Sequence, residues 1–127
     1  PMDSKTFDSC SGSITEDSMP RESAIVRQIV KAVRKEFPTA YVRKIADRFT
    51  RGMPDIMILF WMILDDKYGY AGLTLFVETK TLDGKTSKIQ DEEHRQIRRA
   101  GGEVLVATSA AAVLAKMREM GAVKTNA

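Results

Sequence analysis

The sequence has little cysteine and little histidine. One cysteine, Cys10, and one histidine, His94, stand in a chain of 127 residues. A single cysteine excludes an internal disulfide, and the two residues together exclude zinc sites built from several thiolates or imidazoles. The scarcity of cysteine favours a reducing environment, and we expect the protein to work in the cytoplasm.

Long hydrophobic runs are also missing. The longest run, IMILFWMIL at residues 56 to 64, is too short for a membrane-spanning helix, which needs about 18 residues or more. No charged-then-apolar signal peptide opens the chain, and we therefore expect no membrane partner. No internal repeat is visible, and the length is that of one domain with one core.

Basic residues are scarce at the beginning of the chain. Residues 1 to 20 hold one lysine and four acids, a net charge of −3, whereas the whole chain carries +3. Residues 1–17 are rich in Ser, Thr and Asp without periodicity, and we expect a disordered polar tail followed by a single domain over residues 18–127. A basic body favours an anionic partner such as nucleic acid, although many basic domains are simply soluble.

The spacing of apolar residues predicts seven elements, in the order helix, three strands, helix, strand, helix. Ser18 is expected to cap the first helix and Pro38 to end it. The second strand has apolar residues in both alternating sets and is expected to be buried on both faces. The order indicates an α/β fold, a mixed sheet flanked by helices. The expected helices cover residues 18–37, 87–100 and 109–120, and the expected strands cover residues 40–49, 55–64, 73–81 and 103–108.

Acidic residues occur where apolar ones are expected. Asp55 opens the second strand, and Glu22 lies on the apolar stripe of the first helix. Glu78 and Lys80 share one face of the third strand, because side chains alternate along a strand. A buried charge is unfavourable unless it is paired or bound to a metal. These four side chains could therefore converge at one site.

Such a group of residues suits phosphodiester hydrolysis. Two carboxylates with open water positions suit Mg²⁺, which takes few protein ligands and keeps several waters. A metal can activate a water and stabilise charge on a phosphate. A lysine beside it can orient or deprotonate that water.

Each of these residues also has a structural interpretation. Lys80 could be the salt-bridge partner of Glu78, and Asp55 a turn residue. Glu22 could be a helix-start charge favoured by the helix dipole.

The following helix and the basic residues have structural interpretations as well. Ser87 and Gln90 have the spacing of a capping box, and His94 is expected on the helix surface. Some basic residues are candidates for phosphate contacts, or else belong to solvated faces: Arg48, Arg51, Arg98 and Arg99.

In combination, these residues resemble the PD-(D/E)xK nuclease superfamily, and more closely its VRR-NUC branch of virus-type replication and repair nucleases in stand-alone form. The resemblance covers roughly residues 20 to 110. The segment TSKIQ lacks the Leu and Pro often found before the glutamine, and Thr79 stands where an aliphatic residue is common. The matching residues are Glu22, GMPD at 52–55, ETK at 78–80, Gln90 and GG at 101–102.

The resemblance implies a restriction-endonuclease-like core and a Mg²⁺- or Mn²⁺-dependent DNA endonuclease. Lys80 would position the attacking water. Glu22 would touch the metal or its waters, and Gln90 would orient Lys80 or the scissile phosphate. The implied metal ligands are Asp55, Glu78 and the backbone carbonyl of Thr79.

The DNA substrate is expected to be branched, above all the four-way (Holliday) junction of DNA repair. Resolving a symmetric junction needs two cuts related by a two-fold axis, and a homodimer supplies two sites in that relation. If the protein comes from a phage, we expect it in the cytoplasm of the bacterial host cell. The alternatives are a non-catalytic DNA-binding protein that retains the nuclease fold, and a metal-free structural protein.

Overall fold

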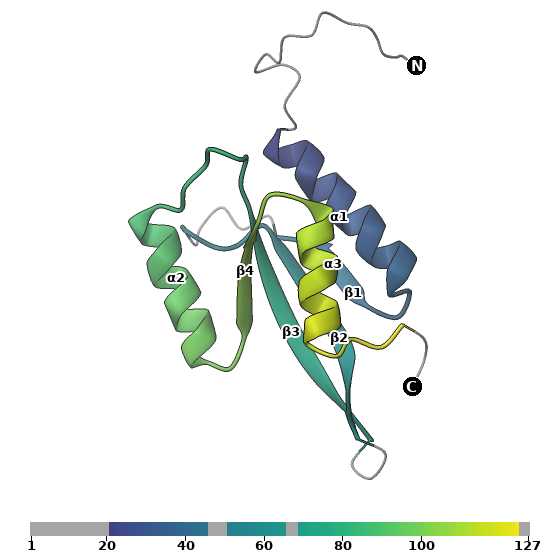
Figure 1. The fold of residues 1–127 in the computed structure, drawn as a ribbon. Helices are drawn as coiled ribbons and strands as arrows, with labels where there is room; N and C mark the ends of the chain where they lie inside the picture. The colour runs from purple at the N-terminus through teal and green to yellow at the C-terminus, as the bar shows by residue number, and fades with distance from the viewer. Residues whose placement is uncertain (1–20, 46–50, 66–68, 125–127) are drawn as a thin grey trace, which may run out of the picture.

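The computed structural model describes residues 21–45, 51–65 and 69–124. It contains a sheet with helices packed on it (Figure 1). The α/β class and the predicted order of elements are confirmed, and the expected tail lies outside the described residues. No helix in the described ranges is long and apolar enough to span a membrane. The elements are α1 (Glu22–Glu36), β1 (Tyr41–Lys44), β2 (Ile56–Asp65), β3 (Gly69–Thr79), α2 (Lys88–Arg99), β4 (Glu103–Ala107) and α3 (Ala110–Glu119).

The sheet is mixed, with the strand order β1-β2-β3-β4. The β1–β2 and β2–β3 pairs are antiparallel, and the β3–β4 pair is parallel. Parallel neighbours need a crossover connection, and α2 supplies it between β3 and β4. Only Leu75–Thr79 of β3 lie beside β4, so the two strands meet where β3 ends.

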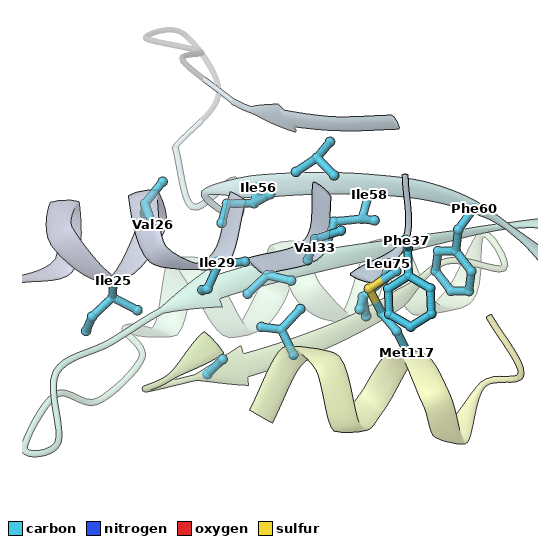
Figure 2. Packing of buried hydrophobic residues seen from close by; sticks show 14 residues of the cluster. Ile25, Val26, Ile29, Val33, Phe37, Ile56, Ile58, Phe60, Leu75 and Met117 are labelled. Carbon is cyan, nitrogen blue, oxygen red and sulfur yellow. The ribbon is translucent and has the colours of Figure 1, made fainter. Parts of the chain in front are cut away.

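The core lies between one face of the sheet and the helices α1 and α3. Ile29 and Val33 of α1 are fully buried, as helical spacing predicts for an apolar stripe. Figure 2 shows them against strand residues such as Ile56, with Met117 of α3 beside Phe37. Burial of each such side chain contributes about 1.5 to 3 kcal/mol.

Helix α2 covers part of the opposite face. A Cβ atom at Gly102 would lie 2.7 Å from the Ile97 side chain of α2 and 3.6 Å from the ring of Phe76 in β3. Phe76 follows Leu75, which is buried in the core, and neighbouring strand residues face opposite sides. The glycine therefore allows α2 to pack closely on β3 and β4.

The prediction that β2 is buried on both faces is wrong. Ile56, Ile58 and Phe60 are buried on the core face, whereas Leu59 and Trp61 on the other face are 41% and 47% exposed. The reason is that α2 sits over β3 and β4 and leaves the second face of β2 open.

Some element boundaries also differ from the prediction. Helix α1 begins at Glu22, because Arg21 has extended backbone angles (φ −78°, ψ 159°) and is the N-cap, so the expected cap at Ser18 is wrong. Strand β3 begins earlier than expected, at Gly69, because its pairing with β2 continues to Tyr70 opposite Ile63. Strand β1 ends at Lys44, earlier than expected, because Ile45 is no longer in a strand. The rest of the expected strand, from residue 46, lies outside the described ranges.

Candidate active site

A tight turn before β2 brings Asp55 to the end of β3. Gly52 has φ +85°, and a Cβ there would lie 2.7 Å from the backbone oxygen of Ile89 in α2. Only glycine allows this conformation and this close approach. The backbone N–H of Asp55 donates to the oxygen of Val77 over 2.9 Å. Asp55 thus joins the sheet just before β2 begins.

Thr79 holds the Asp55 carboxylate. Oδ2 of Asp55 accepts two hydrogen bonds, from the Thr79 backbone N–H at 2.8 Å and from the Thr79 hydroxyl at 2.7 Å. Thr79 is fully buried, so little water competes with these donors. The sequence suggested only a backbone role for Thr79. The signal for the hydroxyl role was a polar side chain at a position where an aliphatic residue is common.

Glu78 is the centre of the site and is 2% exposed. Gln90 Nε2 donates to its Oε2 over 3.0 Å, and His94 Nε2 lies 3.4 Å from its Oε1. Lys80 Nζ lies 3.9 Å from Oε2. Gln90 and His94 are four residues apart in α2 and therefore share one helix face. That face of α2 contacts Glu78 at both oxygens.

The expected surface position of His94 is wrong, because its ring is 2% exposed. Burial lowers the pKa of His94, and the positive charge of Arg98 adds to this effect. The ring is therefore neutral near neutral pH. The spacing of His94, one helical turn after Gln90, is the signal that could have placed it at the site.

The electrostatics of Glu78 reflect its own burial and the partly buried carboxylate of Asp55 nearby. Burial raises its pKa to about 8, and the charge of Asp55 is the next largest cause. A hydrogen bond with Asp55 and the charge of Glu22 act in the same direction, and only Lys80 opposes them. Without a cation, Glu78 therefore keeps its proton at neutral pH.

This donor set fits a hard divalent cation. A cation beside Asp55 and Glu78 would replace the proton that now relieves their repulsion. In residues 21–45, 51–65 and 69–124, no group of three His, Cys, Asp or Glu side chains converges to hold a metal. Two carboxylates nevertheless suit Mg²⁺ or Mn²⁺, since Mg²⁺ is commonly held by one or two carboxylates and retains waters.

Gln90 forms the capping box, and its side chain also contacts the site, at Glu78. Its backbone N–H donates to Ser87 Oγ at 3.2 Å, while its side-chain oxygen accepts from the Ser87 N–H at 2.9 Å. This capping box fixes the first turn of α2. Because Oε1 is used there, Nε2 is directed to Glu78. The same side chain therefore caps α2 through its oxygen and contacts Glu78 through its nitrogen. The expected role of Gln90 in orienting Lys80 or the scissile phosphate stays a prediction.

The remaining expected site residues lie at the edges of the site. Glu22 is exposed in the first turn of α1, and its negative charge nevertheless helps to raise the pKa of Glu78. Lys80 is 12% exposed at its side chain. A Cβ at Gly84 would lie 3.3 Å from carbons of Lys80, so the turn after β3 packs against the lysine stem.

The basic residues have different surroundings. Arg51, Arg98 and Arg99 are all exposed. Arg98 donates to the backbone oxygen of Val104 over 3.2 Å, which ties α2 to β4. Arg48 lies outside the described residues.

Comparisons with known proteins agree with this architecture. The family model of the VRR-NUC domain matches residues 9–111. A solved structure described as a VRR-NUC domain shares 26% sequence identity, with 77% of this chain and 94% of that chain covered and a TM-score of 0.56. No curated protein matches the chain in sequence. The chain therefore belongs to the VRR-NUC family, and this membership implies a nuclease-type function in DNA processing.

Proposed function

We propose that the protein is a Mg²⁺- or Mn²⁺-dependent endodeoxyribonuclease that hydrolyses phosphodiester bonds at the Asp55–Glu78 site. The observation that supports this most is the buried Glu78 beside the partly buried Asp55, since burial and the charge of Asp55 raise the pKa of Glu78 to about 8. A strongly shifted pKa with a specific charge partner is typical of functional sites. The pair has a lysine within 4 Å and an amide that fixes its orientation.

Each side chain has a distinct role in this proposal. When bound, a divalent cation would lower the pKa of a coordinated water and offset the charge that builds on the scissile phosphate. Asp55 and Glu78 would hold that cation, with the carbonyl of Thr79 as a further ligand. Lys80 positions the attacking water and offsets negative charge beside it. Gln90 fixes the direction of Glu78, and Glu22 orients water at the open side.

The proposed substrate is branched DNA, with the four-way junction preferred, and the proposed active form is a homodimer. One site with one set of ligands cuts one strand at a time. Two cuts placed symmetrically need two sites related by a two-fold axis, and such dimers are the commonest oligomers. The exposed arginines Arg51 and Arg99 would contact phosphates without reading sequence.

A cleavage panel tests the proposal. Labelled linear, flapped and four-way DNA substrates would be incubated with Mn²⁺ or Mg²⁺, and with EDTA. We expect cleavage only with metal, fastest on the junction. Asp55→Asn and Glu78→Gln should be folded, should bind DNA and should not cut. Glu119→Gln, which changes a carboxylate that is 73% exposed at its side chain, is the control and should cut normally.

Three outcomes would contradict parts of this proposal. DNA binding without cleavage by the wild-type protein under every metal condition would favour the non-catalytic alternative. Wild-type cleavage rates in Asp55→Asn would show that the site lies elsewhere. Equal rates on linear duplex and four-way junction would remove the case for a structural preference while leaving a general nuclease.

A further inference from the structure

A groove with a basic rim runs between α1 and β1. Helix α1 packs beside β1, which is an edge strand of the sheet (Figure 1). The groove has a volume of about 430 Å³, and we call it the α1–β1 groove. Its lining consists of two valines, which are buried or half-buried, and four exposed cations: Val26, Val30, Arg27, Lys31, Arg34 and Lys44.

The positive charge of this rim is not balanced by acids. None of the lining residues is acidic. Within residues 21–45, 51–65 and 69–124, none of the four cations forms an ion pair with a carboxylate. By contrast, Arg118 and Lys124 both pair with Glu36 at the end of α1. The α1–β1 groove therefore favours an anionic occupant.

Both walls of the groove begin beside the candidate active site. Ile45, which follows Lys44 at the end of β1, donates its backbone N–H to the backbone oxygen of Asp55 over 2.7 Å. On the other wall, Glu22 lies in the first turn of α1, and its charge acts on Glu78. An anion that occupies the groove would therefore continue toward the two carboxyl groups of the site.

The cations of α1 form a row that leads away from the site. Arg27, Lys31 and Arg34 have the spacing of residues on one helix face. With a rise of about 1.5 Å per residue, the row is about 10 Å long. Phosphates of one DNA strand follow each other at about 3.4 Å along the duplex axis, so the row spans about three phosphates.

An apolar floor between cationic walls suits a sugar–phosphate backbone. Val26 and Val30 offer aliphatic surface to the carbon atoms of deoxyribose, while the ammonium and guanidinium groups at the rim bind phosphate oxygens. Contacts of this kind position a protein on DNA without reading its sequence. DNA is also the anion that would already lie at the site where the groove begins.

We propose that the α1–β1 groove binds the backbone of the DNA strand next to the scissile phosphate, with about three phosphates along α1. This inference rests on the proposed nuclease function and adds the path that the DNA takes beyond the site.

A matched pair of double variants tests the proposal. Arg27→Ala/Lys31→Ala removes two exposed charges of the rim. Arg95→Ala/Lys124→Ala removes the same two residue types from exposed positions where each pairs with a carboxylate, and gives the same net charge. Circular dichroism would check the fold of both. If Arg27→Ala/Lys31→Ala does not fold, Arg27→Gln/Lys31→Gln takes its place, since glutamine retains a helix-compatible stem.

Binding of labelled duplex DNA would be measured by fluorescence anisotropy in EDTA over a range of salt concentrations. Arg27→Ala/Lys31→Ala should bind more weakly than wild type. Its slope of log binding constant against log salt concentration should be lower by about 2, because two phosphate contacts are lost. The control Arg95→Ala/Lys124→Ala should keep the wild-type slope.

Uncharged DNA linkages test which phosphates are involved. Duplexes would carry methylphosphonates in place of three consecutive phosphates, with the block moved along one strand. At one position, the block should weaken binding by wild type and by the control variant. The same block should have little effect on Arg27→Ala/Lys31→Ala, because the protein change and the DNA change remove the same contacts.

The outcomes separate this inference from the proposed activity. An unchanged salt slope in folded Arg27→Ala/Lys31→Ala would overturn the inference, as would an equal loss in the control variant. Normal DNA binding by Arg27→Ala/Lys31→Ala, with loss of binding to a poly-glutamate peptide, would assign the groove to an acidic protein segment instead. Groove-dependent DNA binding by a wild type that cuts under no metal condition would support the groove and refute the nuclease function. Metal-dependent cleavage with an unchanged slope would do the reverse.

Discussion

Replacing Glu78 by Gln should stabilise the metal-free protein at neutral pH. The amide has nearly the shape of a protonated carboxyl group, so it can still accept from Gln90 and donate toward Asp55. It carries no charge at any pH. The substitution therefore removes the cost of keeping a proton, at neutral pH, on a carboxyl group that is ionised in the unfolded chain.

The size of the effect follows from the raised pKa of Glu78, which moves from 4.5 to about 8 on folding. The unfolded chain loses this proton first as pH rises. The free energy of unfolding of the wild type therefore falls from about pH 5 to about pH 8 and then levels off. Each pKa unit corresponds to about 1.4 kcal/mol, so the fall is about 4 kcal/mol over that interval. For a chain of this size, that is about 15 °C in Tm.

Urea unfolding in EDTA, followed by circular dichroism between about pH 5 and about pH 8, measures this difference. Glu78→Gln should lack the fall that wild type shows, and Glu119→Gln, a change at an exposed carboxylate, should retain it. Mn²⁺ should stabilise wild type increasingly as pH rises, with release of a proton on binding. A wild-type profile no steeper than that of Glu78→Gln would refute the reasoning, because Glu78 would then be ionised without metal.

Other predictions concern the groups around Glu78. Thr79→Val removes the hydroxyl that donates to Asp55 and should weaken Mn²⁺ binding in calorimetry by about tenfold or more. Thr79→Ser keeps a hydroxyl and should bind Mn²⁺ nearly normally. Equal Mn²⁺ affinity in both variants would exclude a positioning role for the hydroxyl. Lys80→Ala should lose cleavage but keep Mn²⁺ affinity, because an ammonium group is not a ligand; loss of metal binding together with unfolding would support a salt-bridge role. Arg51→Ala and Arg99→Ala should each weaken DNA binding regardless of sequence. Each should also lower the slope of log binding constant against log salt concentration by about 1 per lost phosphate contact. An unchanged slope in the double variant would contradict their role.

The class of fold and the order of its elements could be predicted because both depend on local periodicity. The stripe of Ile29 and Val33 in the first helix follows directly from spacing. The approach of Asp55 to Glu78 could also be anticipated, since both lie where strands end or begin. Their side-chain partners could not, because Thr79 and Asp55 meet through a loop whose path the sequence does not specify.

The position of His94 and the open face of β2 were missed for a common reason. A helix as polar as α2 does not reveal which of its faces packs on the sheet, and only contact with Glu78 identifies it. Likewise, apolar residues on both sides of β2 do not say whether a helix covers the second side. In this chain α2 stops short of Trp61, which is 47% exposed.

The pairing of Gly121–Val123 with β2 has a consequence for the exposed edges of the sheet. A strand edge with open N–H and C=O groups can pair with a strand of another chain and start aggregation. The C-terminal segment occupies the edge of β2 beyond Leu59, where β1 no longer pairs with it. Removing the chain from Gly121 onward would open this edge, and we expect the truncated protein to aggregate more readily than the untruncated one.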